Sequence, residues 1–374
     1  MNLPPPPAAP KPSLAVLYGR AGQFSTSYQT DRLVEALQPW FVTTSLRLRA
    51  RPERPWLSRG ERLWRNWLKP RFTQPSADYL LYGNDGLADL ACWRTRRLLY
   101  WYDAPWDYAA QPPRPRQFVD WLRCRNVVAA DHVFAVSQAQ VALARRLRPG
   151  RQDSVTYLPV GVDCRFFDPA RADAAAARRR YEVPERTVIG YLGYLGHWRG
   201  RFAGEPLVEI APRLLAQQDA HFLVVGSGPA EPMFRERIAA SALRDRFTFT
   251  GFVETEWLPH CLAAMDVCVD TLEPGFHSEA RSETKLKQYM AMGRACVATA
   301  IGENRVDLDD GACGVLVEPG AAALLAGLES LCRDREQRRR LGDAARRRAL
   351  AIYDWPRLAG RLAGTLGLEP RQAR

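Results

Sequence analysis

The chain has 374 residues, of which 47% are hydrophobic and 25% charged, and its net charge is +12. This composition is that of a globular protein, and the length suits two domains rather than one. No apolar run reaches the roughly 18–20 residues that span a bilayer. The positive charge fits a nucleotide diphosphate, a phospholipid surface or an acidic glycan, or a plain bias toward arginine. No nucleic-acid recognition motif accompanies it, so we expect no nucleic-acid partner.

The N-terminus, MNLPPPPAAPKP, lacks the basic start and apolar centre of a signal peptide, and we expect residues 1–12 to form a flexible proline-rich tail. The eight cysteines are scattered and none forms a CxxC pair. Scattered cysteines in apolar stretches indicate reduced thiols, so we expect a cytoplasmic protein.

Short apolar runs alternate with helical patterns along the first half, which is typical of parallel α/β units. We expect strands and helices there in this order: strands 14–19, 41–48, 78–83, 97–103, 131–137 and 154–163, with helices 28–40 and 116–130 between them.

The second half repeats the alternation. We expect strands 187–193, 221–228, 247–252, 266–272, 295–302 and 313–320, with helices 204–218, 257–265, 283–293, 333–353 and 355–366. The sequence therefore predicts an α/β protein with two Rossmann-like domains, 13–170 and 171–354, followed by a C-terminal helix and tail at 355–374.

Glycines follow several predicted strands of the second half: Gly193, Gly226, Gly228 and Gly302. A glycine lets backbone N–H groups approach a phosphate, and ligands bind where parallel strands end, although one glycine after a strand is usually only a turn. VVGSGP lacks the third glycine of a dinucleotide fingerprint because Glu231 takes its place, and no GxxxxGK[ST] occurs. Classical NAD binding and P-loop chemistry are therefore disfavoured.

Lys285 and Gln288 are three residues apart, so they share one face of the predicted helix 283–293. A lysine in the first turn can reach a diphosphate, and the glutamine can hydrogen-bond a ribose hydroxyl. The alternative is an ordinary solvated helix, in which Lys285 and Lys287 face water.

The glycine turns and the helix of Lys285 and Gln288 belong to a longer stretch that resembles a known family. The segment KLKQYMAMGRACVATAIGENRV (285–306) resembles the donor-binding signature of the family 4 (group 1) glycosyltransferases, which have the GT-B architecture. Further similar segments occur in the family's order: ADHVFAVS (130–137), YLPVGVDCRFFDP (157–169), VVGSGP (224–229), FTGFV (249–253) and LAAMDVCV (262–269). The resemblance covers about 130–360, whereas the first 125 residues match only in outline.

The resemblance implies two Rossmann-like domains facing a cleft, with the C-terminal helix returning to the first domain. It also implies a reaction, in which an acceptor hydroxyl attacks the anomeric carbon of a nucleotide-sugar and the nucleoside diphosphate leaves. The family retains the anomeric configuration and needs no bound metal or other cofactor. Basic side chains and helix N-termini stabilise the charge that develops on the leaving group.

Carried onto this sequence, the resemblance makes Lys285 the diphosphate cation and Arg199 or Arg201 the second one. Gln288 would hold the ribose and Glu279 would contact the donor sugar. In the first half, Gly22 and Asp103 are candidates. Gly22 follows the first strand and would approach the donor phosphates, and Asp103, in the turn WYDAPWD, would orient the acceptor hydroxyl unless that aromatic turn only packs.

The sequence departs from the family pattern in three places. Gln288 replaces the second of two glutamates eight residues apart, and Ala280 stands where the first is usual, with Glu279 beside it. Tyr194 stands where an arginine often follows the first glycine loop. Arg294-Ala295 stands where a proline is usual.

No metal site is expected. DLD (307–309) matches the DxD triad of a different glycosyltransferase fold, but it lies in an acidic turn beyond the donor loop. The five histidines show no ligand spacing, and His197 and His277 lie in predicted loops that face the donor.

Residues 47–71 contain nine Lys or Arg and two acids. A predicted helix there carries an apolar stripe, Leu63, Trp64, Trp67 and Leu68, flanked by basic residues. Such a helix suits an anionic membrane surface, so we expect peripheral binding at the inner face of the membrane, the alternative being packing on the first sheet.

The expected partners are a nucleotide-sugar and a glycan or lipid-linked acceptor. The competing functions are a nucleotide-sugar epimerase of similar fold, for which no acid/base set stands out, and a non-catalytic glycan- or nucleotide-binding module.

Overall fold

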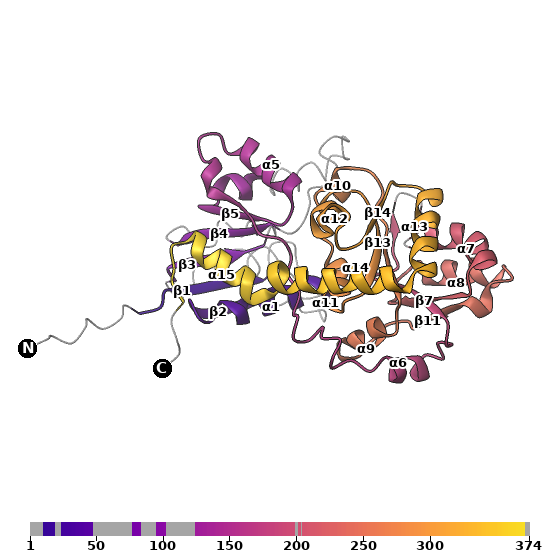
Figure 1. Ribbon diagram of the computed structural model, residues 1–374. Coiled ribbons are helices and arrows are strands. Elements are labelled where there is room, and N and C mark those ends of the chain that lie inside the picture. Colours follow the sequence, from indigo (N-terminus) through magenta and orange to yellow (C-terminus); the bar gives the residue numbers. More distant parts are fainter. Residues whose placement is uncertain are drawn as a thin grey trace, which may run out of the picture. The chain divides into compact units, whose positions relative to one another are not determined.

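The computed structural model describes residues 10–18, 24–47, 77–83, 95–101, 124–198, 201–202 and 204–370 (Figure 1). The chain forms two compact units. Unit 1 comprises Met1–Val160 and Trp355–Arg374, and unit 2 comprises Gly161–Asp354. Each unit contains one parallel sheet with its own apolar core.

The unit 1 sheet has the order β2-β1-β3-β4-β5-β6 among the described residues, and every neighbouring pair is parallel. Its central strands are buried, as expected when helices cover both faces of a parallel sheet. The elements are β1 (Ser13–Tyr18), α1 (Phe24–Leu37), β2 (Val42–Arg47), β3 (Tyr79–Tyr82), β4 (Arg96–Trp101), β5 (His132–Ala135), α5 (Gln138–Leu147), η3 (Gln152–Ser154) and β6 (Val155–Tyr157).

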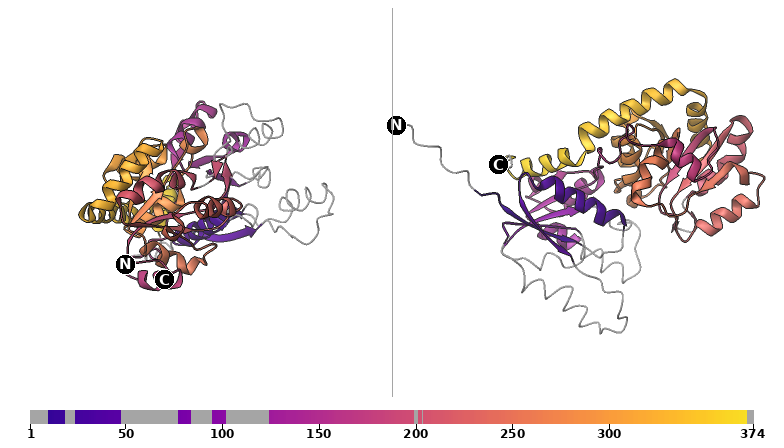
Figure 2. Two further views of the ribbon diagram at one scale, coloured as in Figure 1. Left: turned by 90° about the vertical axis from the view of Figure 1, so that its right-hand side faces the viewer. Right: turned by 90° about the horizontal axis from the view of Figure 1, so that it is seen from below.

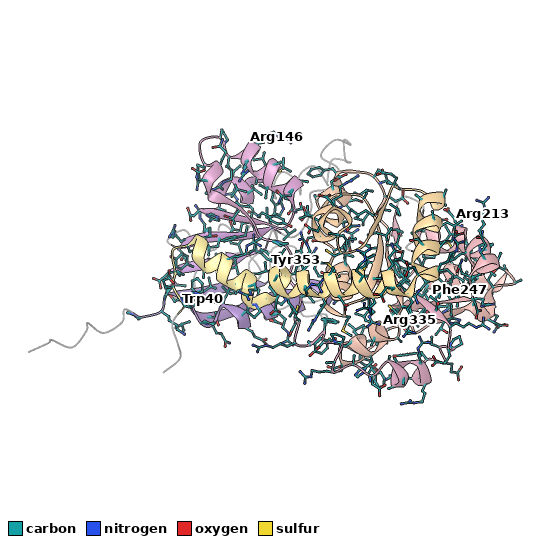
Figure 3. All side chains as sticks on the ribbon, viewed as in Figure 1. Trp40, Arg146, Arg213, Phe247, Arg335 and Tyr353 are labelled. Carbon is teal, nitrogen blue, oxygen red and sulfur yellow. The ribbon has the colours of Figure 1, made fainter. Side chains whose placement is uncertain are left out.

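The C-terminal helix α15 (Trp355–Thr365) belongs to unit 1 and lies beside α1 (Figures 1 and 2). Its apolar face buries Trp355 and Leu358 in the same core as Leu37 of α1. The ring of Trp40, labelled in Figure 3, lies against Gly360, where an added Cβ would be 3.7 Å from it. The predicted return of this helix to the first domain is therefore confirmed.

The unit 2 sheet has the order β11-β10-β7-β12-β13-β14, again wholly parallel. Counted within the unit, this is the 3-2-1-4-5-6 order of a Rossmann fold, and the order reverses between β7 and β12. The strands are β7 (Thr187–Leu192), β10 (Ala220–Val225), β11 (Phe247–Phe249), β12 (Val267–Asp270), β13 (Ala295–Thr299) and β14 (Val315–Val317), with a small hairpin of β8 (His197–Trp198) and β9 (Arg201–Phe202).

Helices cover both faces of this sheet, and an apolar cluster lies on each side. Helix α11 (Thr284–Ala291) is held against β7 because the backbone N–H of Leu192 donates to the Tyr289 hydroxyl at 2.7 Å. The helices of unit 2 are α6 (Ala174–Arg180), α7 (Glu205–Gln217), α8 (Glu231–Ala239), η4 (Arg244–Arg246), η5 (Thr255–Trp257), α9 (Leu258–Ala263), α10 (Phe276–Glu279), α11 (Thr284–Ala291), α12 (Glu303–Asp307), η6 (Asp309–Gly311), α13 (Ala321–Arg333), α14 (Arg335–Arg348) and the π-helical turn η7 (Ala349–Tyr353).

The segment that enters unit 2 is tied to its last helix. Arg346 of α14 donates to the carbonyl oxygens of Phe167 (2.8 Å), Cys164 (3.1 Å) and Ala291 (2.6 Å). The N–H of Val162 donates to the carbonyl of Tyr353, which Figure 3 labels, at 2.9 Å. The chain enters unit 2 at Gly161 and leaves it after Asp354, and these hydrogen bonds fix the segments next to both points to unit 2.

Within the described parts of the chain, no helix combines the length and the apolar character needed to cross a membrane.

Candidate functional site

Lys285 lies in the first turn of α11, shortly after the N-cap residue Glu283. Its Nζ is 2.9 Å from Oδ1 of Asp270, which ends β12, and 4.9 Å from the ring centroid of Tyr191 in β7. Strands β7 and β12 are the neighbours between which the strand order reverses, so Lys285 stands at the topological switch point of unit 2. Ligands of open parallel sheets bind in this position.

The ion pair fixes the charge of this lysine. Asp270 is 0% exposed and the Lys285 side chain 14% exposed. Burial alone would lower the pKa of Lys285, but Asp270, Tyr191 and Glu283 outweigh it and raise the pKa above its usual value. Burial raises the pKa of Asp270, and Lys285 opposes this. We assign an ion pair from the short Nζ–Oδ1 distance, so Lys285 is a fixed cation rather than a general base.

A second ion pair adjoins the first. Nη2 of Arg281 is 2.7 Å from Oε1 of Glu283, whose side chain is largely buried. Burial would raise the pKa of Glu283, but Arg281 and Lys285 lower it overall. We call Tyr191, Asp270, Arg281, Glu283 and Lys285 the switch-point cluster.

Only Lys285 of this cluster is predicted from the sequence, and the other four members are not: Tyr191, Asp270, Arg281 and Glu283. Asp270 carried a signal, because a carboxylate that closes the apolar strand VCVD must lie where the sheet ends. Arg281 and Glu283 gave none, since charged residues before a helix are usually solvated.

The glycine turns at this edge pack closely against each other. A Cβ on Gly226 would lie 2.0 Å from the carbonyl oxygen of Gly193, and one on Gly228 would meet the 193–196 backbone at 2.3 Å. The N–H of Gly193 donates to the last residue of β10 (3.0 Å), and that of Gly226 donates to Gly251 (3.1 Å). These two amides are therefore engaged within the protein, and the glycines serve to let neighbouring turns approach.

Glu279, Gly302 and Gln288 lie at the same edge. Gly302 has φ +50°, and an added Cβ would be 2.7 Å from the carbonyl oxygen of Glu279, so the turn after β13 lies against the backbone of α10. The Glu279 side chain is exposed. Gln288 lies one turn after Lys285 and is partly exposed, and its side chain makes no hydrogen bond to the other described residues. The structure thus places Glu279 beside Gly302 after the strands β12 and β13, and it places Gln288 on the same helix as Lys285.

The other candidates are placed only in part or not at all. Gly22, Asp103 and Arg199 lie outside the described residues, as does the stretch 48–76 that contains most of the basic segment. Arg201 begins β9, and only its backbone is described.

The alternative in which Lys285 and Lys287 face water is wrong. Lys287 is 0% exposed, and its Nζ pairs with the carboxylate of Asp307 and donates to Oγ of Ser282 at 2.9 Å. The same Nζ lies 5.4 Å from the ring centroid of Tyr353. An apolar environment and a buried carboxylate therefore hold this lysine inside unit 2.

The Lys287–Asp307 ion pair also accounts for the first residue of the DLD triplet (307–309). Asp307, its first member, is fully buried and committed to Lys287, and burial raises its pKa. Asp309 pairs instead with Arg348 at 2.9 Å. The two carboxylates are thus engaged with cations on other helices, and the described residues contain no group of three or more His, Cys, Asp or Glu able to hold a metal.

Comparison with known proteins finds similar sequences and similar folds. Residues 186–334 match the family model described as glycosyl transferases group 1. The alpha-D-kanosaminyltransferase of Streptomyces kanamyceticus is 31% identical over 196 residues, which are 52% of this chain and 48% of that protein. A GDP-mannose-dependent alpha-(1-6)-phosphatidylinositol monomannoside mannosyltransferase of Mycobacterium tuberculosis is 30% identical over 222 residues, 58% of this chain and 57% of that protein.

The chain spans about half the length of these curated relatives. Among solved structures, sucrose-phosphate synthase of Thermosynechococcus elongatus superimposes with a TM-score of 0.73 at 20% identity, covering 96% of this chain and 98% of that one. At that identity the likeness establishes the fold alone, which is GT-B. Within this fold, residues 186–334 of the chain are similar to the group 1 glycosyl transferases.

Proposed function

We propose that the protein is a glycosyltransferase that moves a sugar from a nucleotide-sugar donor to an acceptor hydroxyl. The observation that carries the proposal is the switch-point cluster, which places fixed cations at the ligand-binding edge of the region that matches the family. Negative charge develops on the leaving diphosphate in such a transfer, and pre-positioned cations stabilise it without reorganisation. The Mycobacterium relative is named as GDP-mannose-dependent, and GDP-mannose is a nucleotide-sugar.

In this proposal residues 171–354 bind the donor and residues 13–170 the acceptor. Lys285 stabilises the leaving diphosphate, Gln288 accepts or donates a hydrogen bond at the ribose, and Glu279 contacts the transferred sugar. The turns at Gly193, Gly226, Gly228 and Gly302 shape the donor edge, and Arg199 or Arg201, from the loop after β7, adds a second cation. For the two candidates of the first half, we propose that Gly22 approaches the donor phosphates and that Asp103 orients the acceptor hydroxyl.

We further propose that transfer proceeds with retention and without a metal. What supports metal-free transfer is that the cations of the switch-point cluster are side chains already held by carboxylates. Retention is carried over from the family resemblance alone. Transfer should continue in EDTA, and the product's anomeric proton, followed by NMR, should keep the donor's configuration. Loss of activity in EDTA with recovery in manganese would remove the metal-free proposal, and an inverted product would remove retention.

The acceptor is proposed to be a glycan or a lipid-linked molecule of the cell envelope, because the name of the Mycobacterium relative includes a phosphatidylinositol mannoside. Peripheral binding at the inner face of the membrane would bring the cytoplasmic enzyme to it through the basic segment 47–71. Each basic residue near an anionic surface contributes about 1 kcal/mol. Sedimentation should show binding to anionic vesicles that weakens with salt and is lost when Arg62, Arg65 and Lys69 become Glu. Equal binding to neutral vesicles would remove this part of the proposal.

The two competing functions give different outcomes in one experiment. The full chain is incubated with UDP-, GDP-, TDP- and ADP-sugars, and melting temperature, nucleoside diphosphate release and sugar isomerisation are followed. A transferase should be stabilised by one donor class, as ligand binding to the folded state requires, and should release its diphosphate with an acceptor. Isomerised donor without release would establish an epimerase, and stabilisation without any turnover would establish a binding module.

A further inference from the structure

We propose that Arg281 contacts the donor diphosphate as a further cation, alongside Lys285. This inference rests on the proposed function and adds a residue that neither the sequence motif nor the family resemblance indicates. The exposed Tyr194 brings no positive charge to the loop after β7.

The two cations of the switch-point cluster differ in what they offer a ligand. Lys285 is 14% exposed and its Nζ is engaged by the buried Asp270. The Arg281 side chain is 44% exposed. An anion that approaches the sheet edge from solvent therefore meets the guanidinium more openly than the ammonium group.

Arg281 also has hydrogen-bonding capacity to spare. Its Nη2 is paired with Oε1 of Glu283 at 2.7 Å, and within the described residues its guanidinium makes no other ion pair or hydrogen bond. A guanidinium carries five N–H donors in a planar fork, so several remain for phosphate oxygens. Glu283 lies at the N-cap of α11 and orients the fork from its buried side.

The charges of the cluster support the same assignment. Both carboxylates, Asp270 and Glu283, are buried, whereas the more exposed partner in each pair is the cation. The pKa of Arg281 is raised chiefly by Glu283 and further by Asp270 and Tyr191, which shows that it shares one electrostatic environment with Lys285. A diphosphate that approaches from solvent would therefore contact the two cations first, and the buried carboxylates that balance their charge lie behind them.

The test measures the affinity of the full chain for a nucleoside diphosphate and for the matching nucleoside by calorimetry. UDP, GDP, TDP and ADP are screened first, and the tightest is used. Arg281→Ala should weaken diphosphate binding by about 10- to 100-fold, the scale of a lost charged hydrogen bond, and leave nucleoside binding unchanged within about twofold. Arg281→Lys, which keeps the charge and loses the fork, should fall between wild type and Arg281→Ala.

Arg333→Ala is the matched control. Arg333 is 55% exposed and pairs with Glu329 at 2.9 Å, in the last turn of α13, which runs away from the ligand-binding edge. It should bind the diphosphate as wild type does, within about twofold. Unchanged diphosphate binding in Arg281→Ala, or an equal loss of nucleoside binding, would overturn the assignment of Arg281. A wild-type chain that binds none of the four diphosphates would instead overturn the proposed function.

Discussion

The buried pair Lys287–Asp307 makes a demanding prediction about stability. Both side chains are 0% exposed, and the ring of Tyr353 lies beside the ammonium group. Lys287→Met keeps the side-chain length and leaves Asp307 buried without its cation, which typically costs about 3–5 kcal/mol. Because burial already raises the pKa of Asp307, the orphaned carboxyl can take up a proton. The loss of unfolding free energy should therefore be smaller at pH 5 than at pH 7.

The double variant Lys287→Met with Asp307→Asn removes both charges while keeping a polar group in place. It should recover at least about 2 kcal/mol of the loss, since replacing both members of a buried pair is far cheaper than removing one. Urea unfolding of the full chain gives the free energies, and hydrogen exchange of the α11 amides assigns the change to unit 2. A cost below about 1 kcal/mol for Lys287→Met, or no recovery in the double variant, would refute the burial of this pair.

Two further predictions concern unit 2. Burial lowers the pKa of His221 to about 4, and its Nε2 shares a hydrogen bond with Oγ1 of Thr248 at 2.9 Å. The unfolded state then binds more protons than the folded state between about pH 6.5 and 4, so unit 2 should lose about 2 kcal/mol on acidification to pH 4.5. His221→Gln should reduce that loss in urea unfolding at pH 7.5 and 4.5, and an identical pH dependence would contradict it. Gly302→Ala should destabilise by about 1–3 kcal/mol more than Gly311→Ala, since both have positive φ but only the first Cβ would meet the backbone of Glu279. Equal urea midpoints for the two variants would contradict the close packing at Gly302.

Much of unit 2 could be predicted from the sequence because its central strands are buried along most or all of their length. The runs at 187–193 and 221–228 are apolar throughout most of their length, which is what a parallel strand covered on both faces requires. The strand predicted over 221–228 is too long. Strand β10 ends at Val225, and the next residue, Gly226, adopts φ +125°. The helix expected over 333–353 is also interrupted, because α14 gives way to a π-helical turn after Arg348.

The candidate site was less predictable because its contacts join separate elements. The three-residue spacing placed Lys285 and Gln288 on one helical face, but no local pattern reveals that Asp270, 15 positions earlier, would pair with Lys285. Lys287 is a second residue whose partner the sequence does not reveal. A lysine in a polar stretch is normally expected to face solvent, and only the folded chain places Asp307 beside it.

The central claim is that Lys285 stabilises the leaving diphosphate of a nucleotide-sugar, and removing it alone does not test this cleanly. Lys285→Ala leaves Asp270 buried and unpaired, so lost activity could reflect a damaged fold. Lys285→Ala combined with Asp270→Asn removes that unpaired charge.

The decisive measurement is the turnover of this double variant with the donor that wild type uses. The comparison is made after thermal unfolding has shown that the variant melts near the melting temperature of wild type. The proposed function predicts a fall of about 10²–10³ in kcat, the effect of losing one group that stabilises the transition state. Wild-type turnover in the folded double variant would contradict it.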